Sequence, residues 1–541
     1  MNSMDLCFIQ YLVVSALVLI AQSTPTLSPL GPLNPLNPLN PLGPPNSTLI
    51  TDGQFILNST NQRIRLRCAN WYGAHQELHV VGGLELRSVS RLADLFQASG
   101  ANCVRLPYSV EMVKYNPLVT PEAVAGITPT DGCNSTRRAL DVMDCVVSHL
   151  QRRGILIIFN SHNSHGTWVG AGAAKPDQGL WNLPGYSTED WIQSMELITG
   201  RYKIAGMDLR NEIHDQEGVR ITWGESDNIN TDWLAASTAA YARLYRIDPD
   251  ILAIVGGLCW NTDIRAMTRT VGPAQALRNR KLVYTVHIYT FSFWWNEQAI
   301  LTKVMAPLSI WLFLVYLTAS ITCFYCNYYG SGWSEGYELL DVLSDRPKSI
   351  PRSTTVLAFL SASVCFDAGW LAFAVFYYNT AIAAGCSSFA DESNWLIILA
   401  SSALEVALCA AGYLCYTREF PCLLFISFAL LWLSLFFLGI FTVGTYLSSH
   451  TSYLDSLNTW SLHDSPVPVW VGEFGTGTPD EPIFKLIWEF INARHDLDFA
   501  YWAFNGRKWK NGVWESEGFG LMNDNYSDWR MPGLTQAMFN D

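Results

Sequence analysis

Eight short apolar segments recur along this chain, and stretches with helical periodicity lie between them. A buried parallel strand reads as a continuous apolar run, whereas an amphipathic helix places apolar residues three and four positions apart. The expected strands are 64–70, 103–107, 155–160, 204–209, 252–256, 282–287, 467–472 and 498–502. Eight alternating units predict an α/β fold, a (β/α)8 TIM barrel whose functional residues lie where the strands end.

One long interval interrupts this alternation. The sixth and seventh expected strands start 185 residues apart, and removing 303–450, which is 148 residues, leaves an ordinary 37. This block contains four apolar segments long enough to cross a bilayer core of about 30 Å: 304–324, 356–378, 395–416 and 422–446. An even number of spans returns the chain to the side it left. We therefore expect a four-helix transmembrane insertion in the loop after strand 6, between a first barrel part, 51–302 (strands 1–6), and a second, 451–541 (strands 7–8).

Loop charge predicts on which side of the membrane the barrel lies. Arg346, Lys348 and Arg352 lie between the first two spans and Arg418 between the last two, whereas the middle connection, 379–394, has no Lys or Arg. Because basic loops stay in the cytosol, the barrel is expected to be extracellular or luminal. Residues 1–23 are expected to be a signal peptide or signal anchor, and the Pro-Leu-Asn repeats of 24–50 a spacer. The chain is thus predicted to be a multi-pass protein of the secretory pathway or plasma membrane.

Composition narrows the range of partners. The net charge is −13 and no Lys/Arg cluster stands out, so nucleic acid is not expected as a partner. No zinc pattern is present among the cysteines, but Cys133 and Cys145 could form a disulfide. The five barrel cysteines are an odd number, so at least one free thiol is expected. Asn-X-Ser/Thr sequons at Asn46, Asn58, Asn134 and Asn525 all lie outside the membrane block and suggest a glycoprotein.

Two of the expected strands lead to a glutamate. Glu212 follows the run that starts at Ile204, and Glu473 follows the run that starts at Val467. Two carboxyl groups at a barrel rim are the minimal equipment for cleaving a glycosidic bond. Arg105 would favour the ionised form of Glu473, while burial and a neighbouring carboxylate would raise the pKa of Glu212. No cofactor is expected, and no metal, because His162 and His165 lack a third ligand at suitable spacing.

The strand-end motifs resemble those of glycoside hydrolase family 5, most closely its cellulase-type members. The resemblance covers 56–300 and 451–530. The residues that carry it are Asn70-Trp71-Tyr72-Gly73, Asn102-Cys103-Val104-Arg105-Leu106-Pro107-Tyr108-Ser109, Ser161-His162, Asp208-Leu209-Arg210-Asn211-Glu212, Val286-His287-Ile288-Tyr289, Gly472-Glu473-Phe474-Gly475 and Tyr501-Trp502.

The resemblance implies a role for each of eight residues. Glu212 would be the general acid/base and Glu473 the nucleophile. Arg105 and Tyr289 would hold the nucleophile, Asn211 would bind the sugar 2-hydroxyl, His162 and His287 would line the reacting subsite, and Trp502 would stack on a sugar. The chain departs from the family in having Ile213 where Pro is common and Asn160-Ser161-His162 where Asp-X-His is common. Both departures concern substrate preference and rate.

The expected function is therefore that of a membrane-anchored retaining β-glycosidase, a cellulase-like endo-β-1,4-glucanase. A position of the insertion after strand 6 would keep the catalytic face near the lipid bilayer. The expected substrate is a β-glucan or related glycan. One alternative is a glycosphingolipid-cleaving glycosidase, similar to endoglycoceramidase or glucosylceramidase, whose partner would be a glycolipid. A second is a non-catalytic carbohydrate-binding membrane receptor, against which the intact pair Glu212 and Glu473 argues.

Overall fold

Eight parallel strands close into a barrel in the order β10-β3-β4-β5-β6-β7-β8-β9. The computed structural model describes residues 48–133, 137–168, 178–216, 218–289 and 467–539. The barrel strands are β3 (Arg67–Asn70), β4 (Cys103–Ser109), β5 (Leu156–Asn163), β6 (Gly206–Asp208), β7 (Leu252–Gly256), β8 (Leu282–His287), β9 (Val469–Phe474) and β10 (Asp498–Tyr501). The predicted α/β TIM barrel is confirmed.

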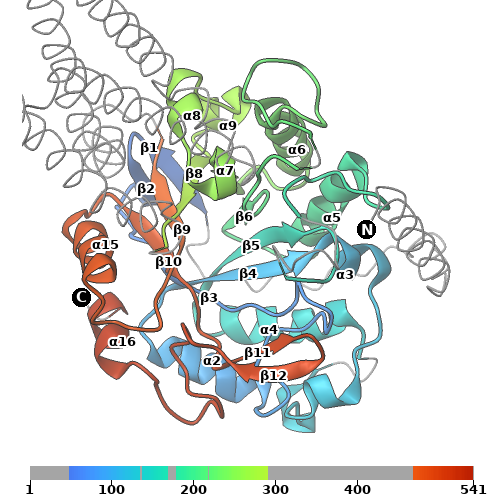
Figure 1. Cartoon of the computed structure of the whole chain (residues 1–541), viewed down its shortest axis with the longest axis vertical. Helices are drawn as coiled ribbons and strands as arrows, with labels where there is room; N and C mark the ends of the chain where they lie inside the picture. Colours follow the sequence, from blue (N-terminus) through green and yellow to red (C-terminus); the bar gives the residue numbers. More distant parts are fainter. Residues whose placement is uncertain (1–47, 134–136, 169–177, 217, 290–466, 540–541) are drawn as a thin grey trace, which may run out of the picture. The chain divides into compact units, whose positions relative to one another are not determined.

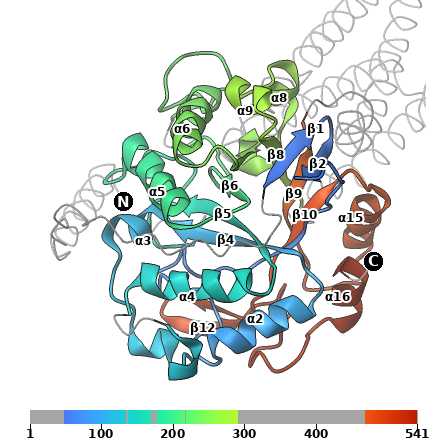
Figure 2. The same cartoon turned by 180° about the vertical axis from the view of Figure 1, so that it is seen from behind.

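Helices surround the strands on the outside of the barrel (Figures 1 and 2). The longer ones are α2 (Val89–Ala98), α4 (Ala139–Gln151), α5 (Thr188–Arg201), α6 (Trp233–Ile247) and α15 (Pro482–Ala493). The shorter ones are α3 (Val110–Tyr115), η1 (Pro121–Val124), η2 (Pro129–Asp131), α7 (Leu258–Asn261), α8 (Arg265–Arg269), α9 (Ala274–Arg278) and α16 (Pro532–Phe539). In α2 the Ser88 side chain caps the first turn, and Val89, Leu92 and Phe96 are buried on one face. The main apolar core therefore lies between helices and strands.

The sequence interpretation missed two hairpins. β1 (Leu49–Asp52) and β2 (Phe55–Asn58) pair in antiparallel fashion and pack on the buried residues where the barrel strands begin. The N–H of Thr51 donates to the carbonyl of Arg280, just before β8, which places this hairpin at the amino-terminal end of the barrel. Asp52-Gly53 is a known hairpin signal, so this element was predictable. The second hairpin, β11 (Arg507–Lys510) and β12 (Val513–Ser516), follows β10.

The observed strand limits differ from the predicted ones where the apolar run and the stretch paired with neighbouring strands have different limits. β7 and β8 agree with the prediction at both ends. β6 is only three residues long because pairing with β5 covers Gly206–Asp208 alone, although Ile204 and Ala205 are also buried. β9 starts and ends two residues later than predicted, so Glu473 lies inside the strand.

The predicted signal, most of the spacer and the four predicted membrane spans lie outside the described residues. The insertion falls within 290–466, between β8 and β9 in the sequence. Within the described ranges, no helix is both long and apolar enough to span a bilayer.

Two disulfides lie within the barrel domain. Cys133 and Cys145 are bonded, as the sequence suggested, and an unpredicted bond joins Cys68 of β3 to Cys103 of β4. Cys259 is disulfide-bonded as well. The expectation of a free thiol among the five barrel cysteines is therefore wrong. It assumed that these cysteines pair only with one another, and an odd number of cysteines in a domain does not require that.

Candidate active site

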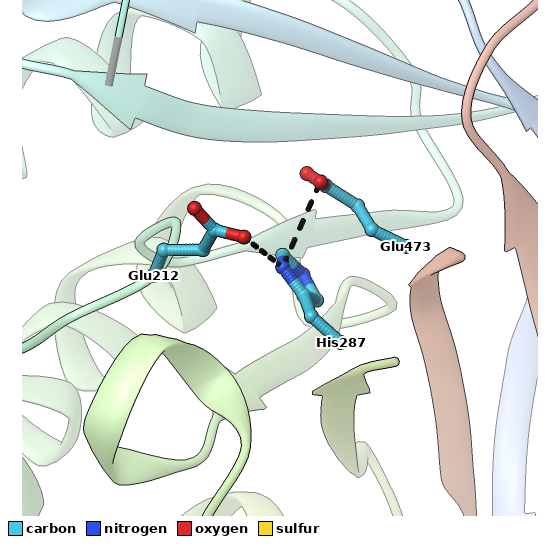
Figure 3. Close-up of side chains that lie close together, drawn as sticks. All are labelled: Glu212, His287 and Glu473. Carbon is cyan, nitrogen blue, oxygen red and sulfur yellow. Dashed lines mark hydrogen bonds and ion pairs between the residues drawn. The ribbon is translucent and has the colours of Figure 1, made fainter. Parts of the chain in front are cut away.

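Glu212 and Glu473 converge on His287 at the carboxyl-terminal rim of the barrel. Figure 3 shows the imidazole with dashed lines to both carboxyl groups. His287 Nδ1 lies 2.9 Å from Glu212 Oε1 and 3.7 Å from Glu473 Oε2. One ligating atom from each of the three side chains lies within 4.8 Å of the others. Two acids 261 positions apart in the sequence thus share one site.

The two glutamates reach the site from different backbone settings. Glu473 is part of β9, paired with His287 of β8 across the ladder. Glu212 follows β6 by four residues and adopts a left-handed backbone with φ 42°. Such a backbone is uncommon for a residue other than glycine and is enriched at functional sites. The loop after β6 therefore sets the direction of the Glu212 side chain.

Arg105 connects the nucleophile candidate to the barrel wall. Its guanidinium is wholly buried and donates to Glu473 Oε1, to Asp208 Oδ2 at 2.9 Å and to Asn70 Oδ1 at 2.9 Å. It also donates to Asn211 Oδ1 at 2.9 Å. A planar guanidinium with fixed donors can hold several acceptors in defined positions. Arg105 therefore fixes where the Glu473 carboxylate lies.

Tyr289 and Asn211 complete the polar surroundings of the acids. The Tyr289 hydroxyl donates to Glu473 Oε2 at 3.0 Å, so both oxygens of this carboxyl accept a hydrogen bond. The Asn211 amide oxygen accepts from Arg105, whereas its buried Nδ2 has no partner among the described residues. A buried amide donor without a partner is suited to a ligand hydroxyl.

His162 and Trp502 lie together beside this group. Their rings stack with centroids 5.8 Å apart, and His162 Nδ1 is 2.6 Å from Asn160 Oδ1. Tyr72 lies parallel to Trp502 with ring centroids 4.6 Å apart, so both Tyr72 and His162 stack on the Trp502 ring in this conformation. Trp502 is buried in this conformation, with 7% of its surface exposed.

Burial adjusts the protonation of Glu212 for a general acid. Desolvation raises the pKa of Glu212 to about 7, against the opposing effects of His214 and Arg105. A carboxyl group with a pKa near neutrality can hold a proton and then release it during turnover. The expected upward direction agrees with this pKa, although burial is its main cause.

Arg105 favours the ionised form of Glu473, as expected from the sequence, but it does not decide the direction of the pKa. Desolvation by burial raises the pKa of Glu473, and His287 and Arg105 only partly oppose that rise. The Arg105 guanidinium is also shared with a second buried carboxylate, Asp208. Burial also lowers the pKa of His287 to about 4, so this imidazole is neutral. One guanidinium faces the carboxyl groups of Asp208, Glu212 and Glu473, so the site favours keeping one of them protonated. Glu212 is the most exposed of these side chains, at 18%.

The cluster of Glu212, His287 and Glu473 also has a spacing that a cation could use. However, a cation there would lie beside the positive charge of Arg105, which is already bonded to Glu473. Like charges at this range repel strongly in a buried site. The donor set therefore fits a pair of acids better than a resident metal.

Two residues of the site lie in the resembling motifs but were given no role from the sequence. Asp208 forms a buried ion pair with Arg105 at 2.8 Å, and Asn70 accepts from the same guanidinium. Both are the last residues of their strands, and Asn70 lies beside Arg105 in the ladder. Polar residues that close apolar barrel strands were therefore the available signal.

Comparison with known proteins finds similarity to one family of glycosidases. Residues 67–312 match the family model described as cellulase (glycosyl hydrolase family 5). A glycosyl hydrolase 5 family protein of Chamaecyparis obtusa is 26% identical over 265 residues, covering 46% of this chain and 45% of that protein. An endoglucanase of Paenibacillus polymyxa is 28% identical over 217 residues, covering 39% and 50%. The chain thus spans about half the length of these curated relatives.

A solved structure supports the fold independently. The catalytic domain of the major endoglucanase from Xanthomonas campestris pv. campestris aligns with a TM-score of 0.50 at 14% identity. The alignment covers 91% of this chain and 100% of that domain. At this identity the likeness shows a shared barrel fold.

Proposed function

We propose that this chain, whose barrel is similar to catalytic domains of glycosyl hydrolase family 5, belongs to that family and hydrolyses β-glucan by double displacement. The observation that supports this most directly is the convergence of Glu212 and Glu473, with reactive atoms within 4.8 Å. Retaining glycosidases hold their two carboxyl groups about 5–5.5 Å apart, whereas inverting enzymes need about 6.5–9.5 Å to admit a water molecule. The short separation favours retention.

In the first step, a Glu473 carboxylate oxygen attacks the anomeric carbon as the glycosidic bond breaks. Glu212 gives its proton to the departing oxygen, which a pKa of about 7 allows at neutral pH. Arg105 and Tyr289 hold the two Glu473 oxygens and so set the direction of attack. A covalent glycosyl-enzyme ester results, and the negative charge passes from Glu473 to Glu212.

In the second step, Glu212 acts as a base. It takes a proton from water, the water oxygen attacks the anomeric carbon, and the bond to Glu473 breaks. Loss of the Glu473 charge in the ester makes ionisation of Glu212 easier in this step, because two close carboxylates oppose each other. The unpartnered Asn211 Nδ2 is placed to donate to the sugar 2-hydroxyl throughout.

The proposed substrate is a β-1,4-glucan, cut within the chain. This rests on the endoglucanase name of the Paenibacillus polymyxa relative and on the stacking pair His162 and Trp502 beside the acids. Stacking on aromatic rings together with few hydrogen bonds suits neutral sugars. Cleavage of a glycosphingolipid by the same acids is the competing outcome that the assay must separate.

The proposal is tested by hydrolysis of cello-oligosaccharides, mannan and a vesicle-bound glycosphingolipid, comparing wild type with Glu473→Gln. Wild type should release β-configured product from the glucan, and the variant should lose about 10⁴-fold or more in kcat. Equal rates for the two proteins would remove Glu473 as nucleophile. Cleavage of the glycolipid alone would replace the glucan substrate.

We further propose that the barrel lies outside the cytosol, attached to the membrane by the segments predicted within 303–450. Two disulfides in the described domain and the exposed sequon at Asn525 support an oxidising, secretory location. Enzymatic deglycosylation should shift the mobility of the full chain, and Asn525→Gln should reduce that shift. The contrary result comes from protease added outside intact cells. A barrel that carries no sugar and is digested only after the membrane is permeabilised would lie in the cytosol.

A further inference from the structure

The turn after β7 brings a buried amide against His287. Asn261, the last residue of α7, is wholly buried, and its Nδ2 lies 3.4 Å from His287 Nε2. Its Oδ1 is also buried and has no partner among the described residues. The amide therefore faces the side of the imidazole opposite to Glu212, which contacts Nδ1. No step described so far uses Asn261.

The local backbone is arranged to admit this amide. Gly256, at the end of β7, faces it, and a Cβ at that position would lie 2.4 Å from Asn261 Oδ1. Cys259, Trp260 and Asn261 have φ of 48°, 60° and 57°, three consecutive left-handed residues. Such strained residues persist where surrounding contacts impose them.

The same turn is fixed to the loop of the acid/base candidate. The ring of Trp260 stacks on His214 with centroids 3.4 Å apart, and the backbone N–H of Trp260 donates to the carbonyl of Ile213 at 2.9 Å. His214 Nδ1 lies 2.7 Å from the carbonyl of Glu212. Asn261 and Glu212 thus approach His287 from two loops that contact each other.

The protonation of His287 connects its contact with Asn261 to its contact with Glu212. The imidazole is neutral, since its pKa is lowered to about 4 by burial, with Glu473 and Asp208 raising it and Arg105 lowering it. It therefore carries one N–H, on Nδ1 or on Nε2. The Asn261 amide turns Nδ2 toward the ring, so Nε2 accepts this hydrogen bond and the single N–H lies on Nδ1.

This single tautomer serves Glu212 in both of its states. Nδ1–H donates to Oε1 of Glu212 whether the carboxyl is neutral or ionised. In the neutral state the Glu212 proton lies on Oε2 and is free for the departing oxygen, and in the ionised state Oε2 can take a proton from water. No proton has to move between the two ring nitrogens.

We propose that Asn261 is a positioning residue that acts through His287, by fixing which ring nitrogen carries the proton and so supporting both states of Glu212. This inference rests on the proposed function for its link to turnover. The arrangement of the imidazole proton itself does not depend on which glycan is cleaved.

The first test compares substrates that need the acid with substrates that do not. Asn261→Gly removes the amide and tolerates the positive φ. It should lower kcat/KM about tenfold to a hundredfold on cellotetraose. On a 2,4-dinitrophenyl β-cellobioside, whose leaving group needs no proton, the first step should be almost unchanged. An equal loss on both substrates would reduce Asn261 to a structural role and overturn the proposal.

A conservative variant and a matched control sharpen this result. Asn261→Asp presents only acceptor oxygens to Nε2 and so favours the Nε2–H tautomer, and it should not recover cellotetraose cleavage. Asn116→Gly removes an amide from another left-handed residue, φ 43°, at the end of α3, where it accepts from the Leu140 N–H. It should lower stability without separating the two substrates. A separation as large in Asn116→Gly would contradict the assignment.

A second measurement does not require activity. In the chain labelled with ¹⁵N-histidine, the ring nitrogen shifts of His287 at pH 6 should show the proton on Nδ1 in wild type and a mixture in Asn261→Gly. The same tautomer in both proteins overturns the inference. If wild type cleaves no glycan but the tautomer still depends on Asn261, the proposed function fails and the positioning of His287 stands.

Discussion

At the scale of single residues, Arg105 has the largest expected effect on stability as well as on activity. Replacing it in Arg105→Met leaves Asp208 and Glu473 buried without their cation. Removing one partner of a buried pair typically costs about 3–5 kcal/mol. We expect a loss of that size in the free energy of unfolding, measured by urea denaturation, together with loss of glucan hydrolysis.

Arg243 offers the matched control for this substitution. It also bonds two carboxylates, Glu189 and Glu196, but its side chain is 31% exposed on the outer surface. Exposed ion pairs contribute about 0–1 kcal/mol. Arg243→Met should therefore leave hydrolysis intact and cost at most about 1 kcal/mol. A cost similar to that of Arg105→Met would show that burial does not distinguish the two sites.

The raised pKa of Glu212 predicts a pH-dependent loss of stability. Below about pH 4.5 the carboxyl is protonated in both folded and unfolded chains, so its favourable contribution is fully present. Between pH 4.5 and about 7 the unfolded chain releases the proton and the folded chain keeps it, so stability falls as pH rises. Each pKa unit corresponds to about 1.4 kcal/mol, which limits the loss to roughly 3 kcal/mol, and the 18% exposure of the side chain reduces it further.

Comparing wild type with Glu212→Gln, whose amide does not titrate, isolates the contribution of Glu212 to the pH dependence of stability. Urea unfolding at pH 4 and pH 8 should show wild type losing stability relative to the variant as pH rises. The opposite trend would mean that the folded pKa of Glu212 lies below that of the unfolded chain. The general-acid assignment would then lose its electrostatic support.

At the scale of elements, the two disulfides should stabilise the barrel by different amounts. Cys68–Cys103 closes a separation of 35 residues between two adjacent strands, and Cys133–Cys145 closes 12. Loop-closure entropy gives about 4 kcal/mol for the first and about 3 kcal/mol for the second. The double alanine variants, unfolded by urea without reductant, should therefore rank in that order. A reversed order would show that strain or packing outweighs chain entropy here.

The strand elements show what a sequence can and cannot predict. β7 and β8 were predicted at both ends because turn residues flank them, such as Asp248-Pro249-Asp250 before β7 and Gly256-Gly257 at its end. β6 was predicted too long because apolar residues continue beyond the ladder. Glu212 was identified as an acid, but its left-handed backbone leaves no trace in residue pattern. The contact of Asn261 with His287 is a tertiary one, between loop and strand, and no local period reports it.

At the scale of the whole molecule, the barrel must close although β8 and β9 lie far apart in the sequence. These strands pair in parallel, with Tyr284 beside Val469 and His287 beside Glu473. A parallel connection needs a crossover of about a dozen residues or more. Removing 303–450 leaves 290–302 and 451–466, which is 29 residues and therefore enough. The two barrel parts, 48–289 and 467–539, are expected to close without the predicted membrane insertion.

The final prediction follows from this closure. A chain lacking 303–450 should remain in solution without detergent and cleave cellotetraose with the kcat/KM of the full chain, because Glu212, His287 and Glu473 keep their positions in paired strands and adjoining loops. On vesicle-bound glycolipid the full chain should be faster, since only it would be held at the bilayer. Glu473→Gln in the shortened chain controls for contaminating glycosidase. An aggregated or inactive shortened chain would mean that the segment takes part in folding, and equal rates on vesicles would show that it does not direct the enzyme to membrane substrates.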